Sequence, residues 1–94
     1  MARSKIVVTG LGALAPNGNS VDQFWDNSIA GKSGIGPVSY FDTEGHRVTI
    51  AGELSDFDPE SVLDTREVRK LDPFSIYAIT AAEEAVTLAG IDPD

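Results

Sequence analysis

The sequence predicts an α/β fold in which a central β-strand is covered by helices on both faces. The first observation is the apolar run from Ile6 to Leu14, where almost no polar residue intervenes and neither face of a strand suits water. The second is a helical period of apolar residues over 21–29, and the third is a long alanine-rich helix expected over 73–89. A strand of this kind belongs in the middle of a sheet.

Composition excludes several classes of function. The 94 residues carry 15 acidic and 7 basic side chains, a net charge of −8, which argues against general binding to nucleic acid or anionic membranes. The absence of cysteine excludes a disulfide, a thiolate metal site and a cysteine nucleophile within these residues. No stretch approaches the roughly 20 apolar residues of a membrane span, and no export signal is evident, so we expect a cytoplasmic protein.

The first helix follows a turn at residues 17–19. Ser20 is expected to open it, because Gln23 stands three residues later, the spacing of a capping box. Gly31 is expected to end it as a left-handed cap. Its apolar stripe, expected to contribute Phe24 and Trp25 to the core, consists of Val21, Phe24, Trp25, Ser28 and Ile29.

The middle of the chain contains two expected connectors and one expected strand. Residues 32–37 and 41–46 are rich in turn formers and predict loops. From Val48 to Leu54, apolar residues alternate with more polar ones, which predicts a second strand with one polar face.

Three helix starts follow in quick succession. Asp58-Pro59 predicts a short helix through Leu63, and Asp64 predicts another that ends near Lys70. Asp72-Pro73 opens the longest helix, which runs to Ala89 and is stopped by Gly90. Its inward face, with many alanines that allow close approach of another backbone, consists of Phe74, Tyr77, Ala78, Ala81, Ala82, Ala85 and Ala89.

These elements do not complete a domain. Two strands form only a marginal ribbon in water, and the alanine face of the last helix has no obvious partner in the chain. We therefore expect residues 1–94 to be one part of a larger domain.

Several stretches, taken together and in order, resemble the β-ketoacyl-acyl-carrier-protein synthases of the elongating, type II-like group. These are condensing enzymes of the thiolase superfamily that act in fatty-acid and polyketide synthesis. The resemblance covers essentially all 94 residues, although Pro73 stands where a longer side chain is expected. The matching stretches are Val7-Val8-Thr9-Gly10-Leu11-Gly12 with Pro16 and Gly18-Asn19, Phe24-Trp25, Ala30 to Ile35, Phe41-Asp42, Ala51-Gly52, Asp56 to Pro59, and Arg69 to Phe74.

The resemblance implies a thiolase-like layered α-β-α-β-α fold, with this chain as the opening part of its first half. It implies decarboxylative Claisen condensation of an acyl-enzyme with malonyl-carrier protein in a homodimer, with no cofactor. The family's catalytic cysteine and two histidines cannot be placed in this chain, so we expect no catalytic residue here. The expected partners are acyl carrier protein and the remainder of the same synthase.

Arg66, Arg69 and Lys70 form a basic cluster. On a helix they fall at i, i+3 and i+4, hence on one face, where like charges repel by a few tenths of a kcal/mol. The simplest interpretation is a solvated face partly neutralised by Glu67. The resemblance implies instead that these positions belong to the docking face for acyl carrier protein.

The segment from Gly10 to Ala15 also matches the dinucleotide pattern G-x-G-x-x-A. A dinucleotide site is not expected here, because residues 16–19 separate the glycines from the helix whose N-terminus would hold the pyrophosphate. We expect the glycines to serve close packing beside the first strand.

The other polar features favour structural roles. His46 is expected to be an exposed loop residue. Asp58 is explained by helix capping, and the neighbouring Asp56 and Glu60 lack the pattern of a calcium loop, so no metal site is expected.

Two further functions fit the sequence. One is a catalytically silent relative, such as the chain-length partner of polyketide systems. The other is a free-standing acidic domain that binds a protein. The sequence does not determine acyl-chain length, starter specificity or pathway.

Overall fold

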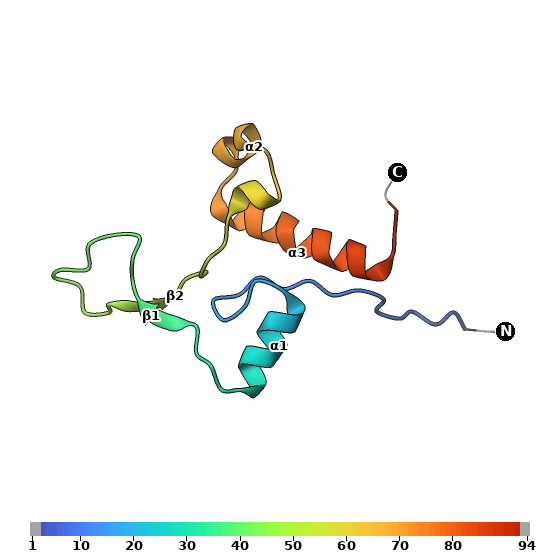
Figure 1. Ribbon diagram of the computed structural model, residues 1–94, viewed down its shortest axis with the longest axis horizontal. Helices are drawn as coiled ribbons and strands as arrows, with labels where there is room; N and C mark the ends of the chain where they lie inside the picture. Colours follow the sequence, from blue (N-terminus) through green and yellow to red (C-terminus); the bar gives the residue numbers. More distant parts are fainter. Residues whose placement is uncertain (1–2, 93–94) are drawn as a thin grey trace.

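The computed structural model describes residues 3–92 and contains four helical elements and one small sheet in that range. Figure 1 shows them spread along an open chain, with α3 in the centre, α2 at one end of α3 and the two-stranded sheet projecting away. In order, they are α1 (Val21–Ile29), β1 (Ile35–Pro37), β2 (Ile50–Gly52), the 3₁₀ helix η1 (Pro59–Ser61), α2 (Thr65–Lys70) and α3 (Pro73–Ala89).

The ends of α1 are set by local hydrogen bonds. The Ser20 hydroxyl accepts the N–H of Gln23 at 3.2 Å, as expected, and the Gln23 side chain accepts the N–H of Asn19 at 2.9 Å. At the other end, Gly31 has φ +73°, and the N–H of Lys32 donates to the carbonyl of Asn27 at 2.8 Å. This is a Schellman motif, so the predicted glycine stop is confirmed.

The last helix also has the predicted bounds. Pro73 occupies its first turn, and Gly90 ends it with φ +72°. The N–H of Ile91 donates to the carbonyl of Val86 at 3.2 Å, which again satisfies an end carbonyl. Such ends are predictable because capping depends on residues close in sequence.

The N-terminal segment lies directly against α3. A Cβ atom added to Gly12 would lie 1.7 Å from the carbonyl oxygen of Ala81, and one added to Gly10 would lie 2.1 Å from that of Ala85. Only glycine permits this approach, as expected. The alanine face therefore has a partner within the chain, and the expectation that it had none is wrong (Figure 1).

The strands differ from those predicted. β1 and β2 pair antiparallel with Gly36 opposite Ala51, so β1 lies in a segment predicted to be a connector, and β2 is shorter than the predicted strand. Within residues 3–92, the run from Ile6 to Leu14 is not a β-strand, because no other segment there pairs with it. A strand exists only when a hydrogen-bonded neighbour is present.

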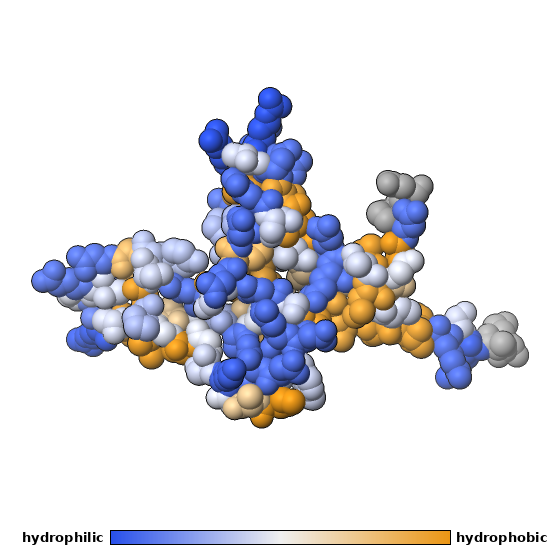
Figure 2. Space-filling view, in the orientation of Figure 1, coloured by the Kyte–Doolittle hydropathy of each residue, from blue (hydrophilic) through white to orange (hydrophobic). Residues whose placement is uncertain are grey.

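The chain encloses almost no core. Its radius of gyration is 17.0 Å, whereas a compact domain of about 100 residues has about 13 Å. Among the described residues Ile76 is the only hydrophobic residue that is buried, at 5% exposure, and Trp25 is 61% exposed. The expectation that Phe24 and Trp25 form core is therefore wrong for this chain, and Figure 2 shows extended hydrophobic surface.

Candidate functional site

The predicted basic cluster lies on α2, a helix of six residues. Asp64 begins it, because the Asp64 carboxylate accepts the N–H of Glu67 at 2.9 Å. Arg69 and Lys70 occupy the last turn, where positive charge interacts favourably with the helix dipole. The helix ends at Leu71, whose N–H donates to the carbonyl of Glu67 at 3.2 Å. Both ends of α2, the helix that carries the basic cluster, are therefore set by residues close in sequence.

The opposite side of α2 is anchored by apolar contacts. Val68 and Leu71 line a pocket of about 320 Å³, together with Phe57, Ile76 and Tyr77 from the neighbouring segments. Phe57 meets Tyr77 edge to face, with ring centroids 5.8 Å apart. Since the apolar side of α2 faces this pocket, its charged side is held toward solvent.

Burial is the largest cause that raises the pKa of Tyr77, and interaction with Tyr40 raises it further. Tyr40 comes from the loop after β1, and it lines the same pocket. The phenol of Tyr77 therefore favours its protonated form, and its interaction with Tyr40 links this loop to α3.

The three cationic side chains are exposed. Within residues 3–92, the side chains of Arg66, Arg69 and Lys70 make no ion pair or hydrogen bond, and Glu67 does not pair with them. The structure thus confirms that α2 presents three cations together, but not that Glu67 neutralises them. In a chain of net charge −8, this is a local positive surface. Figure 2 shows hydrophilic residues over the end of the molecule that α2 forms.

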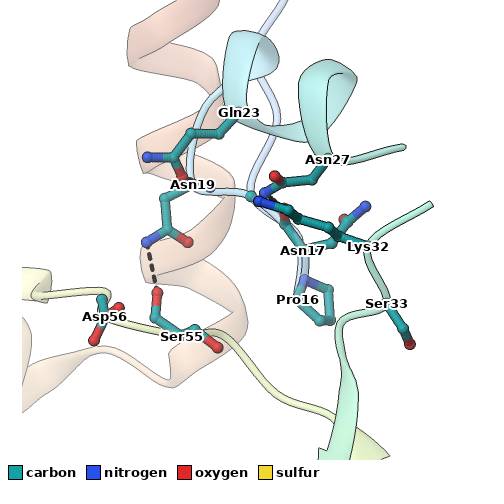
Figure 3. A pocket seen from close by; sticks show the side chains of 10 residues that line it. Pro16, Asn17, Asn19, Gln23, Asn27, Lys32, Ser33, Ser55 and Asp56 are labelled. Atoms are coloured by element: carbon teal, nitrogen blue, oxygen red, sulfur yellow. Dashed lines mark hydrogen bonds between the residues drawn. The ribbon is translucent and has the colours of Figure 1, made fainter. Parts of the chain in front are cut away.

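A polar pocket of about 510 Å³ lies between the turn at 16–19, α1 and the segments 32–33 and 55–56 (Figure 3). The Asn19 amide donates to the carbonyl of Ser55 at 2.7 Å, and the Asn27 amide donates to the carbonyl of Asn17. These amides hold three distant segments together. No sequence pattern indicates this pocket, because its walls come from positions far apart in the chain.

The remaining candidate residues have structural contacts. His46 is exposed and meets the ring of Phe41 with centroids 5.6 Å apart, and Asp58 accepts the N–H of Glu60 at 3.0 Å as the predicted cap. In the described part of the chain, no three His, Cys, Asp or Glu residues are grouped to hold a metal ion. No helix between residues 3 and 92 has the length and apolar character needed to cross a membrane.

Residues 3–94 match the sequence model of one family, described as "Beta-ketoacyl synthase, N-terminal domain". The chain belongs to the β-ketoacyl synthase family. This membership agrees with the glycine-rich start, the first helix and the stretch around α2 that carried the resemblance.

Relatives with known names are similar over nearly the whole chain. The 3-oxoacyl-[acyl-carrier-protein] synthase 2 of Staphylococcus aureus (strain COL) is 46% identical over 88 residues, which cover 94% of this chain and 21% of the relative. The enzyme of the same name from Coxiella burnetii is 40% identical over 92 residues, covering 98% of this chain and 22% of the relative. The β-ketoacyl synthase chain therefore spans about a fifth of the length of these relatives.

Two solved structures confirm the fold class. The ishigamide ketosynthase/chain length factor has a TM-score of 0.87 and 34% identity, over 97% of this chain and 23% of that one. A type II polyketide ketosynthase in complex with its acyl-carrier protein has a TM-score of 0.68 and 35% identity, over 92% of this chain and 22% of that one. The α/β arrangement is thus the opening part of a thiolase-like ketosynthase fold.

Proposed function

We propose that this chain is the N-terminal part of a homodimeric, cytoplasmic 3-oxoacyl-acyl-carrier-protein synthase. The names of the relatives and the family model support this proposal. In it, residues 1–94 belong to a ketoacyl-synthase domain whose remaining strands and helices cover the surfaces left open here. The exposed strand-like run and the exposed side chain of Trp25 are the surfaces that such a remainder would bury.

The reaction proposed for the complete synthase is a decarboxylative Claisen condensation. An acyl group passes from carrier protein to the enzyme cysteine as a thioester. Malonyl-carrier protein then loses carbon dioxide, and the resulting carbanion attacks that thioester and releases the cysteine thiolate. The contribution of this chain is the docking of substrate rather than the chemistry.

The docking surface consists of Arg66, Arg69 and Lys70. The observation that carries this assignment is that three exposed cations without ion-pair partners share one short helix of an otherwise acidic chain. Such a surface attracts an acidic partner and accelerates encounter more than it fixes affinity. A carrier protein with an acidic helix fits this chemistry.

The test is charge reversal in the complete synthase. We expect the double variant Arg69→Glu/Lys70→Glu to raise KM for carrier-bound acyl substrate about tenfold at low salt, or about 1.4 kcal/mol. We expect turnover of an acyl-pantetheine substrate without carrier to stay unchanged. Arg47→Glu, at an exposed cation on the loop between β1 and β2, is the matched control. An unchanged KM for carrier-bound substrate would contradict the proposal that these residues form the docking surface.

A chain-length partner without condensing activity is the second candidate. The similarity to a solved ketosynthase/chain length factor pair supports it. The two functions differ in whether a catalytic cysteine is present, so acyl-enzyme formation in the complete protein, followed by mass spectrometry, separates them.

A further inference from the structure

The helix α2 carries the proposed docking surface on very little regular structure. Its six residues form less than two turns, and helices shorter than about 12–15 residues are marginal in water without further support. Arg66 lies three positions before Arg69 and four before Lys70, so like charges repel along the exposed side of the helix. The cations that attract an acidic partner therefore oppose the helix that presents them.

Asp64 supports this helix at its N-terminal end. Its backbone is extended, with φ −72° and ψ 165°, and its carboxylate accepts the N–H of Glu67 at 2.9 Å. Such an N-cap satisfies one of the N–H groups that have no partner inside a helix. Its replacement by alanine typically lowers the equilibrium constant for helix formation about fivefold. In a helix of six residues, this loss affects the whole element rather than one end.

A second hydrogen bond joins the first residue of α2 to the preceding helix. The Thr65 hydroxyl donates to the Glu60 carboxylate at 3.3 Å, and Glu60 belongs to η1. Both side chains are exposed, so water competes for both groups. The bond to Asp64 is shorter, and it acts directly on the backbone of α2.

Apolar contacts hold the inner side of α2 but do not by themselves require a helix. Val68 and Leu71 are half-buried and line one pocket with Phe57. Hydrophobic contact is non-directional, so it keeps the segment in place without setting its backbone hydrogen bonds. All the partners named here for α2 lie within residues 57–71. Their contacts therefore do not depend on which other surfaces the remainder of the synthase covers.

We propose that Asp64 is a positioning residue for carrier protein, because its cap on α2 keeps the three cations of the docking surface on one face. This inference rests on the docking function proposed above. Carrier protein binds that arrangement only while α2 is formed, so its apparent affinity falls with the fraction of molecules that contain the helix. The charge of Asp64 has the opposite effect, since a carboxylate near the cations weakens their attraction for an acidic partner.

The test compares Asp64→Ala with Asp64→Asn in the complete synthase. Both variants lose the negative charge, but asparagine is as good an N-cap as aspartate and alanine is not. We expect KM for carrier-bound acyl substrate to be at least about threefold higher for Asp64→Ala than for Asp64→Asn, because only alanine lowers the population of α2. Asp64→Ser restores a capping oxygen and should match Asp64→Asn. Turnover of an acyl-pantetheine substrate should be the same in all three variants.

Asp42 provides a matched control. Its carboxylate accepts the N–H of Glu44 at 2.9 Å in the loop between β1 and β2. The bond has the same chemistry and the same length as the cap at α2, but this loop carries no part of the docking surface. Asp42→Ala and Asp42→Asn should therefore have equal KM for carrier-bound substrate.

Equal KM values for Asp64→Ala and Asp64→Asn would overturn the proposal. A matching loss of acyl-pantetheine turnover in Asp64→Ala would also overturn it, because the role would then be general stability. The variant Arg69→Glu/Lys70→Glu separates this inference from the docking function. If charge reversal raises KM and the Asp64 variants do not differ, docking stands and the role of Asp64 is wrong. If charge reversal leaves KM unchanged, the docking function fails and the role of Asp64 fails with it.

Discussion

The carboxylate of Glu84 accepts the backbone N–H of Val21 at 3.0 Å and that of Ala13 at 2.9 Å. Val21 is the first residue of α1, so the negative charge lies at the positive end of that helix. Glu84 itself belongs to α3. One side chain therefore joins α3 to the N-terminal segment and to α1.

Replacement of Glu84 by glutamine removes this charge while keeping the shape. Because hydrogen bonds to charged groups contribute about 1.5–3 kcal/mol, we expect exchange of the Ala13 and Val21 amides to accelerate at least about tenfold. Hydrogen exchange followed by NMR measures this effect. Glu83→Gln, at an exposed position on the same helix, is the control and should leave both amides unchanged.

Gly12→Ala should separate the N-terminal segment from α3, because its Cβ would lie 1.7 Å from the carbonyl oxygen of Ala81. We expect the free energy of unfolding to fall by about 1–3 kcal/mol, the usual cost of overpacking. Urea unfolding followed by the fluorescence of the single tryptophan, Trp25, measures it. Gly36→Ala meets nothing within 4 Å and should be tolerated. Equal losses for both variants would contradict the assigned contact.

Ser39 lies in the loop after β1, and its hydroxyl donates at 2.7 Å to the carboxylate of Glu53, the residue that follows β2. The hydrogen bond from the Ser39 hydroxyl is the first cause that lowers the pKa of Glu53. Because the pKa of Glu53 is lower in the folded state than in the unfolded state, its contact with Ser39 stabilises the fold at pH values above the unfolded-state pKa. This stabilisation is lost as the pH falls through the folded-state pKa. We expect Ser39→Ala to raise the pKa of Glu53 toward its ordinary value in a carboxyl NMR titration. An unchanged Glu53 pKa would show that the hydroxyl is not the cause.

Tyr40→Phe leaves Tyr77 as the only tyrosine, so ultraviolet absorbance then reports one phenol. Burial and Tyr40 both raise the pKa of Tyr77. We expect the variant to lower that pKa while leaving it above the ordinary value, since burial is the larger cause. Because the pKa of Tyr77 is higher in the folded state than in the unfolded state, the contribution of this phenol to stability is fully present at pH values below the unfolded-state pKa. It is lost as the pH rises through the folded-state pKa. Titration at the ordinary value would contradict the burial of Tyr77.

Helix ends and the basic cluster could be predicted from the sequence, whereas strand pairing and the polar pocket could not. Ser20, Gly31, Asp64 and Gly90 act on residues within one or two turns, so their effects can be read locally. The helical period likewise placed Arg66, Arg69 and Lys70 on one short helix. The strand that pairs with Ile50–Gly52 depends on which segments come together in space, which no local pattern specifies. The same holds for the walls of the pocket in Figure 3.

The contact between the N-terminal segment and α3 also sets an order of events during translation. Ala13 and Glu84 are 71 residues apart, so the first apolar run leaves the ribosome long before the helix that receives it has been made. Until then it travels as nascent chain with bare hydrophobic side chains, a state that chaperones bind and that aggregates readily. Packing of the N-terminal segment thus has to wait until α3 has been synthesised.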